Sequence, residues 1–252
     1  MTVYREIFEQ PQSLAEMYLE NKDRVREIAR EVKEATSVFI TARGTSDNAA
    51  RYAQYVWGAF NHLPVTLATP SLFSIYQSPP KLAPDTLVVG VSQSGQSPDI
   101  VAVLKEARQQ GQATLAITNK PESPLAEVAD HIIDIRAPEK AVAATKSYTA
   151  QLQAIAMLSA ELAGDVQRLE EIQALPEWIE AVLKEDDEIA TAALRYRYMN
   201  QCVVLGRGFN YATAFEWALK MKEMAYVVAD PYSSADFRHG PIALVERGFP
   251  VM

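Results

Sequence analysis

A dense group of hydroxyl side chains follows one of the apolar runs of the chain, in the stretch Ser92-Gln-Ser-Gly-Gln-Ser-Pro-Asp99. Ser97 suits the N-cap of a helix, and Pro98 suits its first position. Unpaired backbone N–H groups and the positive end of the dipole make a helix N-terminus attractive to anions, and the hydroxyls of Ser92 and Ser94 would add neutral donors. The stretch therefore predicts a phosphate-binding turn. The plainer alternative is an ordinary strand-to-helix turn with a serine cap.

A second pair of hydroxyls, Thr45 and Ser46, occupies the equivalent place after an earlier apolar run. Ligands of doubly wound sheets lie beyond the carboxyl ends of the strands, where both turns would stand. The pair alone is also consistent with a simple helix cap. Hydroxyl-rich turns at two strand ends favour the interpretation that both face one ligand.

Three charged side chains share a spacing that places them on one helical face. Glu216, Lys220 and Glu223 are separated by four and three residues, a spacing that a solvated face with ion pairs would also show. Moving a proton between adjacent sugar carbons requires a carboxylate, which favours a functional interpretation for this helix because it follows a strand. His239, in the loop-like stretch 236–241, is the side-chain type best suited to open a sugar ring near neutral pH.

Other patterns exclude other chemistries. Cys202 is the single cysteine, which rules out an intrachain disulfide and a multi-cysteine zinc site, and its apolar neighbours predict a buried thiol. The stretch Gly206-Arg-Gly-Phe-Asn-Tyr211 begins like a dinucleotide fingerprint but has tyrosine at the third glycine position, so we expect no NAD site. The sequence contains no P-loop motif. His62, in a loop, and His131, at the start of a strand, are expected to be structural.

The composition narrows the class of protein. Asp and Glu outnumber Lys and Arg, 32 against 24, in a chain of 252 residues with a net charge of −8. This balance argues against a general nucleic-acid binder, which would carry a basic face. The N-terminus lacks the apolar core of a signal peptide, and the most apolar helical stretch, residues 154–163, is too short to span a membrane. We therefore expect a cytoplasmic protein without nucleic-acid or membrane partners.

The elements that must position these residues follow an alternating rhythm. Short apolar runs alternate with helical patterns, which predicts a doubly wound α/β fold with a parallel sheet covered on both faces. The predicted strands are 38–41, 65–68, 87–91, 114–117 and 132–135, and the predicted helices are 11–34, 46–60, 98–110, 123–129 and 145–163.

The rhythm stops at a charged, helical stretch, residues 164–200, with Gly164 and Pro176 as breaks. It resumes with a strand, a helix and a strand, at 202–205, 209–226 and 227–229.

The pairs Arg43-Gly44 and Arg207-Gly208 each follow a predicted strand and precede a predicted helix. This repeated pattern predicts two similar α/β units. The last five residues, Gly248-Phe-Pro-Val-Met252, resemble the opening of a buried strand, and we expect the second unit to be incomplete. The expected organisation is an N-terminal helical segment, a first subdomain, a helical linker and a truncated second subdomain, at residues 1–34, 35–164, 165–200 and 201–252.

Six short stretches, taken in their order along the chain, resemble the sugar isomerase (SIS) family. The resemblance lies in residues 42–46, 92–99, 141–147, 205–208, 219–223 and 237–241. Within the family they resemble the isomerase half of glucosamine-6-phosphate synthase and, more closely, the stand-alone type II glucosamine-6-phosphate deaminases. The resemblance implies two SIS subdomains of flavodoxin-like topology and a homodimer.

The resemblance also implies roles for single residues. Glu223 matches the base that transfers a proton between C1 and C2, and Lys220 matches the lysine that assists at the oxygens. His239 matches the ring-opening residue, which in the synthases reaches the site of the neighbouring subunit. The implied substrate-binding residues are Ser92, Gln93, Ser94 and Ser97 for the phosphate, with Thr45 and Ser46, and Val142 and Ala144 along the sugar.

The chain departs from the synthases in several places. They carry an N-terminal glutaminase domain with a catalytic cysteine, which this chain lacks, so we expect no glutamine-dependent amination by this chain alone. They have Glu-Thr where this chain has Gln96-Ser97, and serine where it has Ala144, and both differences favour the deaminase branch. Their Schiff-base lysine lies near the C-terminus, beyond the point where this chain stops.

We therefore expect an aldose–ketose isomerase that deaminates glucosamine 6-phosphate to fructose 6-phosphate and ammonia. An enediol-type proton shuttle needs only acid and base groups, so no metal or organic cofactor is expected. The alternatives are a synthase-type isomerase and transaminase, a deglycase for other phosphorylated amines, and a non-catalytic sugar-phosphate sensor. Sensors of this family usually carry a DNA-binding domain, for which the first ten residues leave no room.

Overall fold

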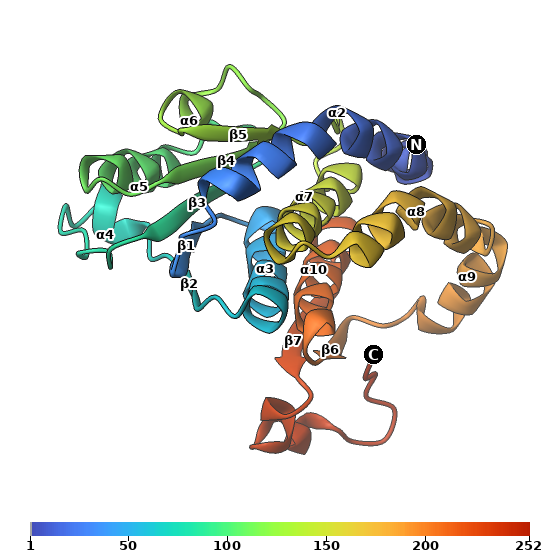
Figure 1. Ribbon diagram of the computed structural model, residues 1–252. Coiled ribbons are helices and arrows are strands. Elements are labelled where there is room, and N and C mark those ends of the chain that lie inside the picture. Colours follow the sequence, from blue (N-terminus) through green and yellow to red (C-terminus); the bar gives the residue numbers. More distant parts are fainter. Residues whose placement is uncertain (1) are drawn as a thin grey trace. The chain divides into compact units, whose positions relative to one another are not determined.

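The computed structural model describes residues 2–252 and divides into two compact units, one ending at Glu177 and the other spanning Trp178–Met252. The first unit contains a five-stranded sheet and the second a two-stranded sheet (Figure 1). No helix within residues 2–252 is long and apolar enough to cross a membrane.

All five strands of the first sheet run parallel. The central strand, β3, is buried at all seven positions, as expected for a strand with helices on both faces. The predicted doubly wound parallel sheet is therefore confirmed. The strands lie in the order β2-β1-β3-β4-β5 and span Ser37–Thr41 (β1), Val65–Leu67 (β2), Thr86–Ser92 (β3), Thr114–Thr118 (β4) and His131–Asp134 (β5).

Two groups of helices cover the two faces of this sheet (Figure 1). Val88 of β3 packs with Ile100 and Leu104 on one face of the sheet. Successive side chains of a strand point to opposite faces, so the equally buried Leu87 and Val89 point to the other face of the sheet. The group on the Val88 face is α4 (Ser71–Ser74), α5 (Pro98–Gln109) and α6 (Pro124–Glu127), and the opposite group is α2 (Gln10–Glu31), α3 (Thr45–Asn61) and α7 (Lys146–Ala163).

Some short elements differ from the sequence-based expectation. The pattern does not predict α1 (Thr2–Phe8) or α4, because neither is long enough to show a helical period. The helix expected at 11–34 ends at Glu31, and the one expected at 123–129 is the single turn α6. Such boundaries depend on tertiary contacts that a periodic pattern does not contain.

The charged stretch after α7 is helical, as predicted. It forms α8 (Val166–Leu183), α9 (Asp186–Ala193) and the 3₁₀ turn η1 (Leu194–Tyr196). Gly164 ends α7 in the left-handed region, with φ +63°. Pro176, however, lies inside α8 and does not break it, because a proline removes one backbone hydrogen bond without forbidding the helical backbone.

The second unit is built on a parallel β-α-β motif. It consists of β6 (Gln201–Gly206), α10 (Phe209–Met224) and β7 (Val228–Ser233). Two 3₁₀ turns follow, η2 (Asp236–Arg238) and η3 (Pro241–Leu244). The last residues return to β6, where Val251 forms a parallel bridge with Val203. The expected strand opening thus pairs, although the Val251 side chain is 42% exposed and not buried.

The two Arg-Gly pairs adopt one backbone conformation. Gly44 is the N-cap of α3 with φ +56° and ψ −132°, and Gly208 is the N-cap of α10 with φ +61° and ψ −132°. Positive φ favours glycine at both positions, since a Cβ atom strains this region. The repeated dipeptide therefore marks the same structural position in each unit.

Candidate functional site

The strand order of the first unit places a topological switch point between β1 and β3. The chain passes from β1 through α3 to β2 on one side, and from β3 through α5 to β4 on the other. The two strands are neighbours, and Thr41 at the end of β1 pairs with Gly90 near the end of β3. Ligands of open α/β sheets bind beyond the carboxyl ends of the strands at such a point. Both predicted hydroxyl turns leave the sheet here.

The turn after β3 is held by its own hydroxyls. The Ser92 side chain accepts a hydrogen bond from the Gly95 N–H at 3.1 Å, and Ser94 accepts one from the Gln96 N–H at 3.3 Å. Gly95 has φ +61°, and a Cβ atom there would lie 2.0 Å from Ser123 Oγ. A glycine is therefore required for the turn to fold back at the start of α5.

Ser97 occupies the N-cap of α5, with Pro98 next to it at the start of the helix. Its backbone is extended, as expected at an N-cap, yet within residues 2–252 its side chain makes no capping hydrogen bond. The helix begins without using this hydroxyl. The plain serine-cap alternative thus describes the backbone of Ser97 but not its side chain, and Ser97 lies at the positive end of the α5 dipole.

The turn after β1 is tied to the turn after β3. Arg43 donates to the Asp99 carboxylate at 2.6 and 2.7 Å, which links the start of α3 with the first turn of α5. Ser46 is buried, and its hydroxyl accepts a hydrogen bond from Gln151 of α7 at 3.0 Å. Thr45 is the first residue of α3. No local pattern predicts that Arg43 pairs with Asp99, or Gln151 with Ser46, since each pair joins residues far apart in the chain.

The residues expected along the sugar lie in the loop between β5 and α7. Val142 is fully exposed and Ala144 is half-buried. Glu139 organises the end of this loop: its carboxylate accepts hydrogen bonds from the backbone N–H groups of Thr145 at 2.6 Å and Ser147 at 3.1 Å, and from both of their hydroxyls. Because it follows β5, the loop leaves the same carboxyl edge of the sheet as the two hydroxyl turns.

In the second unit, α10 brings the three predicted charged residues together. Lys220 Nζ lies 3.2 Å from Glu216 Oε1 and 2.6 Å from Glu223 Oε2. The exposed fractions of the side chains are 8% for Glu216, 18% for Lys220 and 33% for Glu223. The ion pairs of the plain alternative are present, but this is not a fully solvated face. Burial increases along the row toward Glu216, which leaves Glu223 as the more accessible carboxylate.

His239 follows η2 in the stretch after β7, and its side chain is exposed. Its backbone N–H donates to the Asp236 carbonyl at 2.9 Å. Gly240, with φ +130°, turns the chain immediately after it. The imidazole is therefore presented to solvent by a short, hydrogen-bonded turn.

The remaining histidines and the cysteine occupy structural positions. His62 is the C-cap of α3 in the left-handed region, and His131 opens β5 at the amino edge of the sheet, opposite the hydroxyl turns. Cys202 is buried as predicted, and burial raises the pKa of its thiol. Among the described residues, no three acidic, histidine or cysteine side chains cluster so that they could hold a metal ion.

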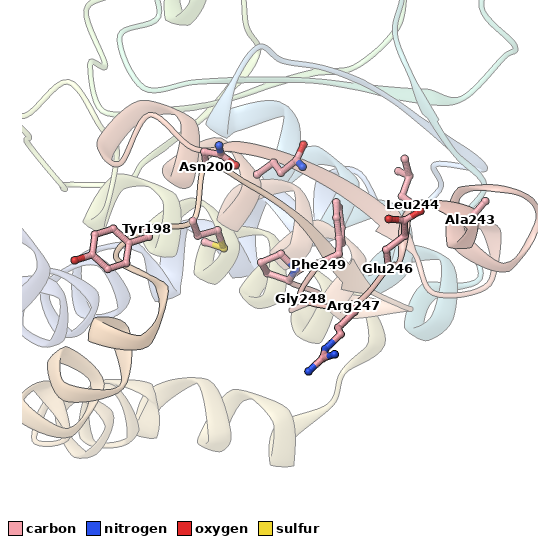
Figure 2. A pocket seen from close by; sticks show the side chains of 11 residues that line it. Tyr198, Asn200, Ala243, Leu244, Glu246, Arg247, Gly248 and Phe249 are labelled. Carbon is pink, nitrogen blue, oxygen red and sulfur yellow. The ribbon is translucent and has the colours of Figure 1, made fainter.

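The second unit also contains a cavity of about 570 Å³ beside β6 (Figure 2). All the predicted site residues are described, and none of them lines it. Residues 198–201, at the start of β6, and residues 243–250, near the end of the chain, form its walls. The lining residues are Tyr198, Met199, Asn200, Gln201, Ala243, Leu244, Glu246, Arg247, Gly248, Phe249 and Pro250.

The chain matches the family model of the SIS domain over residues 31–160 and 196–252. It belongs to the SIS domain family. The matched ranges contain both hydroxyl turns and α10.

Comparison with known proteins identifies similar chains. A glutamine–fructose-6-phosphate aminotransferase (isomerizing) of Pyrococcus horikoshii is 36% identical over 254 residues, which are 98% of this chain and 42% of that protein. The SIS chain thus spans about two fifths of the length of the curated relatives that it matches.

Two solved structures share its fold. One, from Silicibacter pomeroyi and described as a phosphosugar isomerase, is 38% identical with a TM-score of 0.91, covering 98% of this chain and 76% of that one. The other is the C-terminal domain of glucosamine-fructose-6-phosphate aminotransferase from Francisella tularensis. It is 29% identical with a TM-score of 0.90, covering 100% of this chain and 75% of that one.

Proposed function

We propose that the chain binds the phosphate of a phosphorylated sugar at the turn of residues 92–97. The observation that carries the proposal is the pair of hydroxyl-bearing turns at the β1/β3 switch point, with a Ser97 hydroxyl that α5 does not use for capping among the described residues. A phosphate dianion there would meet the hydroxyls, the first-turn N–H groups and the positive end of the α5 dipole. The proposed ligands are Ser92, Gln93, Ser94 and Ser97, supported by Thr45 and Ser46.

The proposed reaction is the deamination of glucosamine 6-phosphate by aldose–ketose proton transfer. His239 opens the sugar ring, and Glu223 takes the proton from C2 of the open-chain amino aldose and returns it at C1. The product is an imine at C2, which water hydrolyses to fructose 6-phosphate and ammonia. Lys220, which lies 2.6 Å from the Glu223 carboxylate, orients the base and assists at the substrate oxygens.

The proposed active assembly is a homodimer in which His239 serves the site of the neighbouring subunit. The exposure of His239, directly after the turn η2, supports this arrangement. A phosphorylated amino sugar is then the substrate, with no nucleic-acid or membrane partner.

A second candidate function is the synthase-type isomerisation and amination of fructose 6-phosphate. The 36% identity to a glutamine–fructose-6-phosphate aminotransferase favours it. Here the same carboxylate would move the proton in the opposite direction, from C1 to C2. Incubation of fructose 6-phosphate with ammonia or with glutamine, followed by detection of glucosamine 6-phosphate, separates this candidate from the deaminase.

The test is the substitution Glu223→Gln, assayed by ammonia release and fructose 6-phosphate formation from glucosamine 6-phosphate. Loss of the base should lower kcat by at least about a hundredfold while leaving the sugar-phosphate Kd near that of the parent protein. Glu188→Gln, at an exposed position of α9, is the matched control and should retain full activity. Undiminished turnover by Glu223→Gln would refute the assignment, and binding without turnover by the parent protein would favour the sensor.

A further inference from the structure

The N-terminal helix α1 holds the loop that contains Val142 and Ala144. Glu6 of α1 is only 2% exposed, and its carboxylate accepts hydrogen bonds from the backbone N–H of Lys140 at 2.6 Å and of Ala141 at 3.2 Å. A buried carboxylate is costly unless donors satisfy it, and these two amides do so. Glu6 is therefore bonded to the backbone directly before Val142.

Two further contacts tie the start of α7, on the other side of Val142, to the N-terminal helices. Glu9 accepts from Lys146 Nζ at 2.5 Å, and the Lys146 side chain is 7% exposed. Gln10 Oε1 lies 3.1 Å from Thr149 Oγ1. The loop is thus fastened to the N-terminal helices before and after Val142.

The exposed part of the loop tip depends on these contacts, while Ala143 beside it is buried. Val142 is 100% exposed, so its own side chain buries no surface that would fix its position, and Ala143 next to it supplies the buried side chain of the tip. Hydrogen bonds fix its backbone through the amides of residues 140 and 141 on one side, and the burial of Ala143 and the Glu139 network fix it on the other. A change at Glu6 should therefore displace the tip while leaving the Glu139 network in place.

We propose that Glu6 is a positioning residue that sets the 140–144 backbone against which the sugar lies. The proposal rests on the proposed function, in which Val142 and Ala144 line the sugar. Glu6 itself does not touch the substrate; it acts through the loop. Its removal should weaken substrate binding more than it slows the chemical step, because the proton-transfer residues belong to the other unit.

The experiment compares Glu6→Gln and Glu6→Ala with Glu27→Gln, an exposed α2 control whose carboxylate pairs with Arg24 at the surface. Glutamine keeps one acceptor oxygen, so it satisfies one of the two amides, and alanine satisfies neither. Hydrogen exchange of peptides covering residues 139–145 should accelerate about tenfold in Glu6→Gln, with β3 and β4 unchanged. KM for glucosamine 6-phosphate should rise about tenfold, with kcat within about twofold of the parent.

Each outcome either supports or overturns the positioning role of Glu6. Unchanged exchange at 139–145 in Glu6→Gln, the milder variant, would show that Glu6 does not hold the loop. Faster exchange with an unchanged KM would overturn the positioning role while leaving the proposed function intact. A parent protein that binds no sugar phosphate would instead overturn the proposed function, whatever the exchange rates of the variants.

Discussion

Ser97 and Ser123 stand in the same local sequence, a serine before a proline at the start of a helix, yet their hydroxyls differ. Ser123 caps α6 by accepting a hydrogen bond from the Ala126 N–H at 3.4 Å. Ser97 makes no such bond to any part of the chain that the structure describes. At the residue scale, this contrast separates a structural serine from a candidate ligand more sharply than the motif does.

The first prediction compares these two serines. Ser97→Ala should change the free energy of unfolding by less than about 0.5 kcal/mol, because no cap is lost, whereas Ser123→Ala should cost about 1 kcal/mol. Ser97→Ala should also weaken glucosamine 6-phosphate binding about tenfold, since a hydrogen bond to an anion is lost. Urea unfolding and calorimetric titration measure the two effects. A Ser97→Ala variant with reduced stability and normal affinity would identify Ser97 as structural only.

The second prediction concerns Gly95, where positive φ and close contact coincide. Gly95→Ala should cost about 2 kcal/mol or more, because its methyl group would meet Ser123 Oγ in addition to the backbone strain. Gly111→Ala is the matched control. It has φ +77°, but no atom of residues 2–252 lies within 4 Å of its Cβ position, so only about 1 kcal/mol of strain is expected. Equal costs in urea unfolding would contradict the steric argument.

At the scale of elements, the N-terminal helices and the α7 start are linked by charge. The hydrogen bond from Lys146 lowers the pKa of Glu9 below its usual range, more than the partial burial of Glu9 raises it. A carboxyl with a lowered folded-state pKa contributes stability that is fully present above its unfolded pKa. That contribution is lost as the pH falls through the folded value.

The third prediction follows from the lowered pKa of Glu9. Glu9→Gln should be less stable than the parent protein at pH 7, and the difference in unfolding free energy should shrink as the pH falls below about 4.5. Glu16→Gln, an exposed α2 variant, should show no such convergence. Urea unfolding at several pH values between 3 and 7 measures it. A difference that does not change with pH would show that the ion pair contributes no acid-dependent stability.

At the scale of the whole molecule, the proposed reaction needs residues of both units and, for His239, of two subunits. Glu223 and Lys220 belong to α10 of the second unit, while the proposed phosphate turn belongs to the first. The proposed phosphate-binding residues and the proposed proton-transfer residues thus belong to different units. Subunit complementation tests whether His239 acts in the site of its own subunit or in that of the neighbouring subunit.

The fourth prediction uses two inactive variants, His239→Ala and Glu223→Gln, produced together. In a mixed dimer one site would combine the intact His239 of one subunit with the intact Glu223 of the other, so random pairing should restore about a quarter of parental activity. Each variant produced alone is the control. Co-produced variants that stay inactive, although sedimentation shows mixed dimers, would place His239 in the site of its own subunit.

The sequence determined those features that depend on local pattern. Short apolar runs predict the parallel sheet because a strand buried on both faces is apolar along most of its length, as Leu87–Val91 of β3 is. The repeated Arg-Gly pair predicted one backbone conformation at two helix starts, because positive φ favours glycine. The spacing of Glu216, Lys220 and Glu223 predicted one helical face, because helix geometry is set by residue count alone.

Only the tertiary structure decided the features that depend on contacts between distant residues. Three such contacts join segments far apart in the chain. Arg43 pairs with Asp99, Gln151 donates a hydrogen bond to Ser46, and Glu6 accepts hydrogen bonds from the backbone of residues 140 and 141. No local period encodes such pairs, and a buried glutamate looks the same in a sequence as an exposed one. The absence of a Ser97 cap within residues 2–252 is likewise a matter of side-chain geometry, since the residue type alone predicts the opposite.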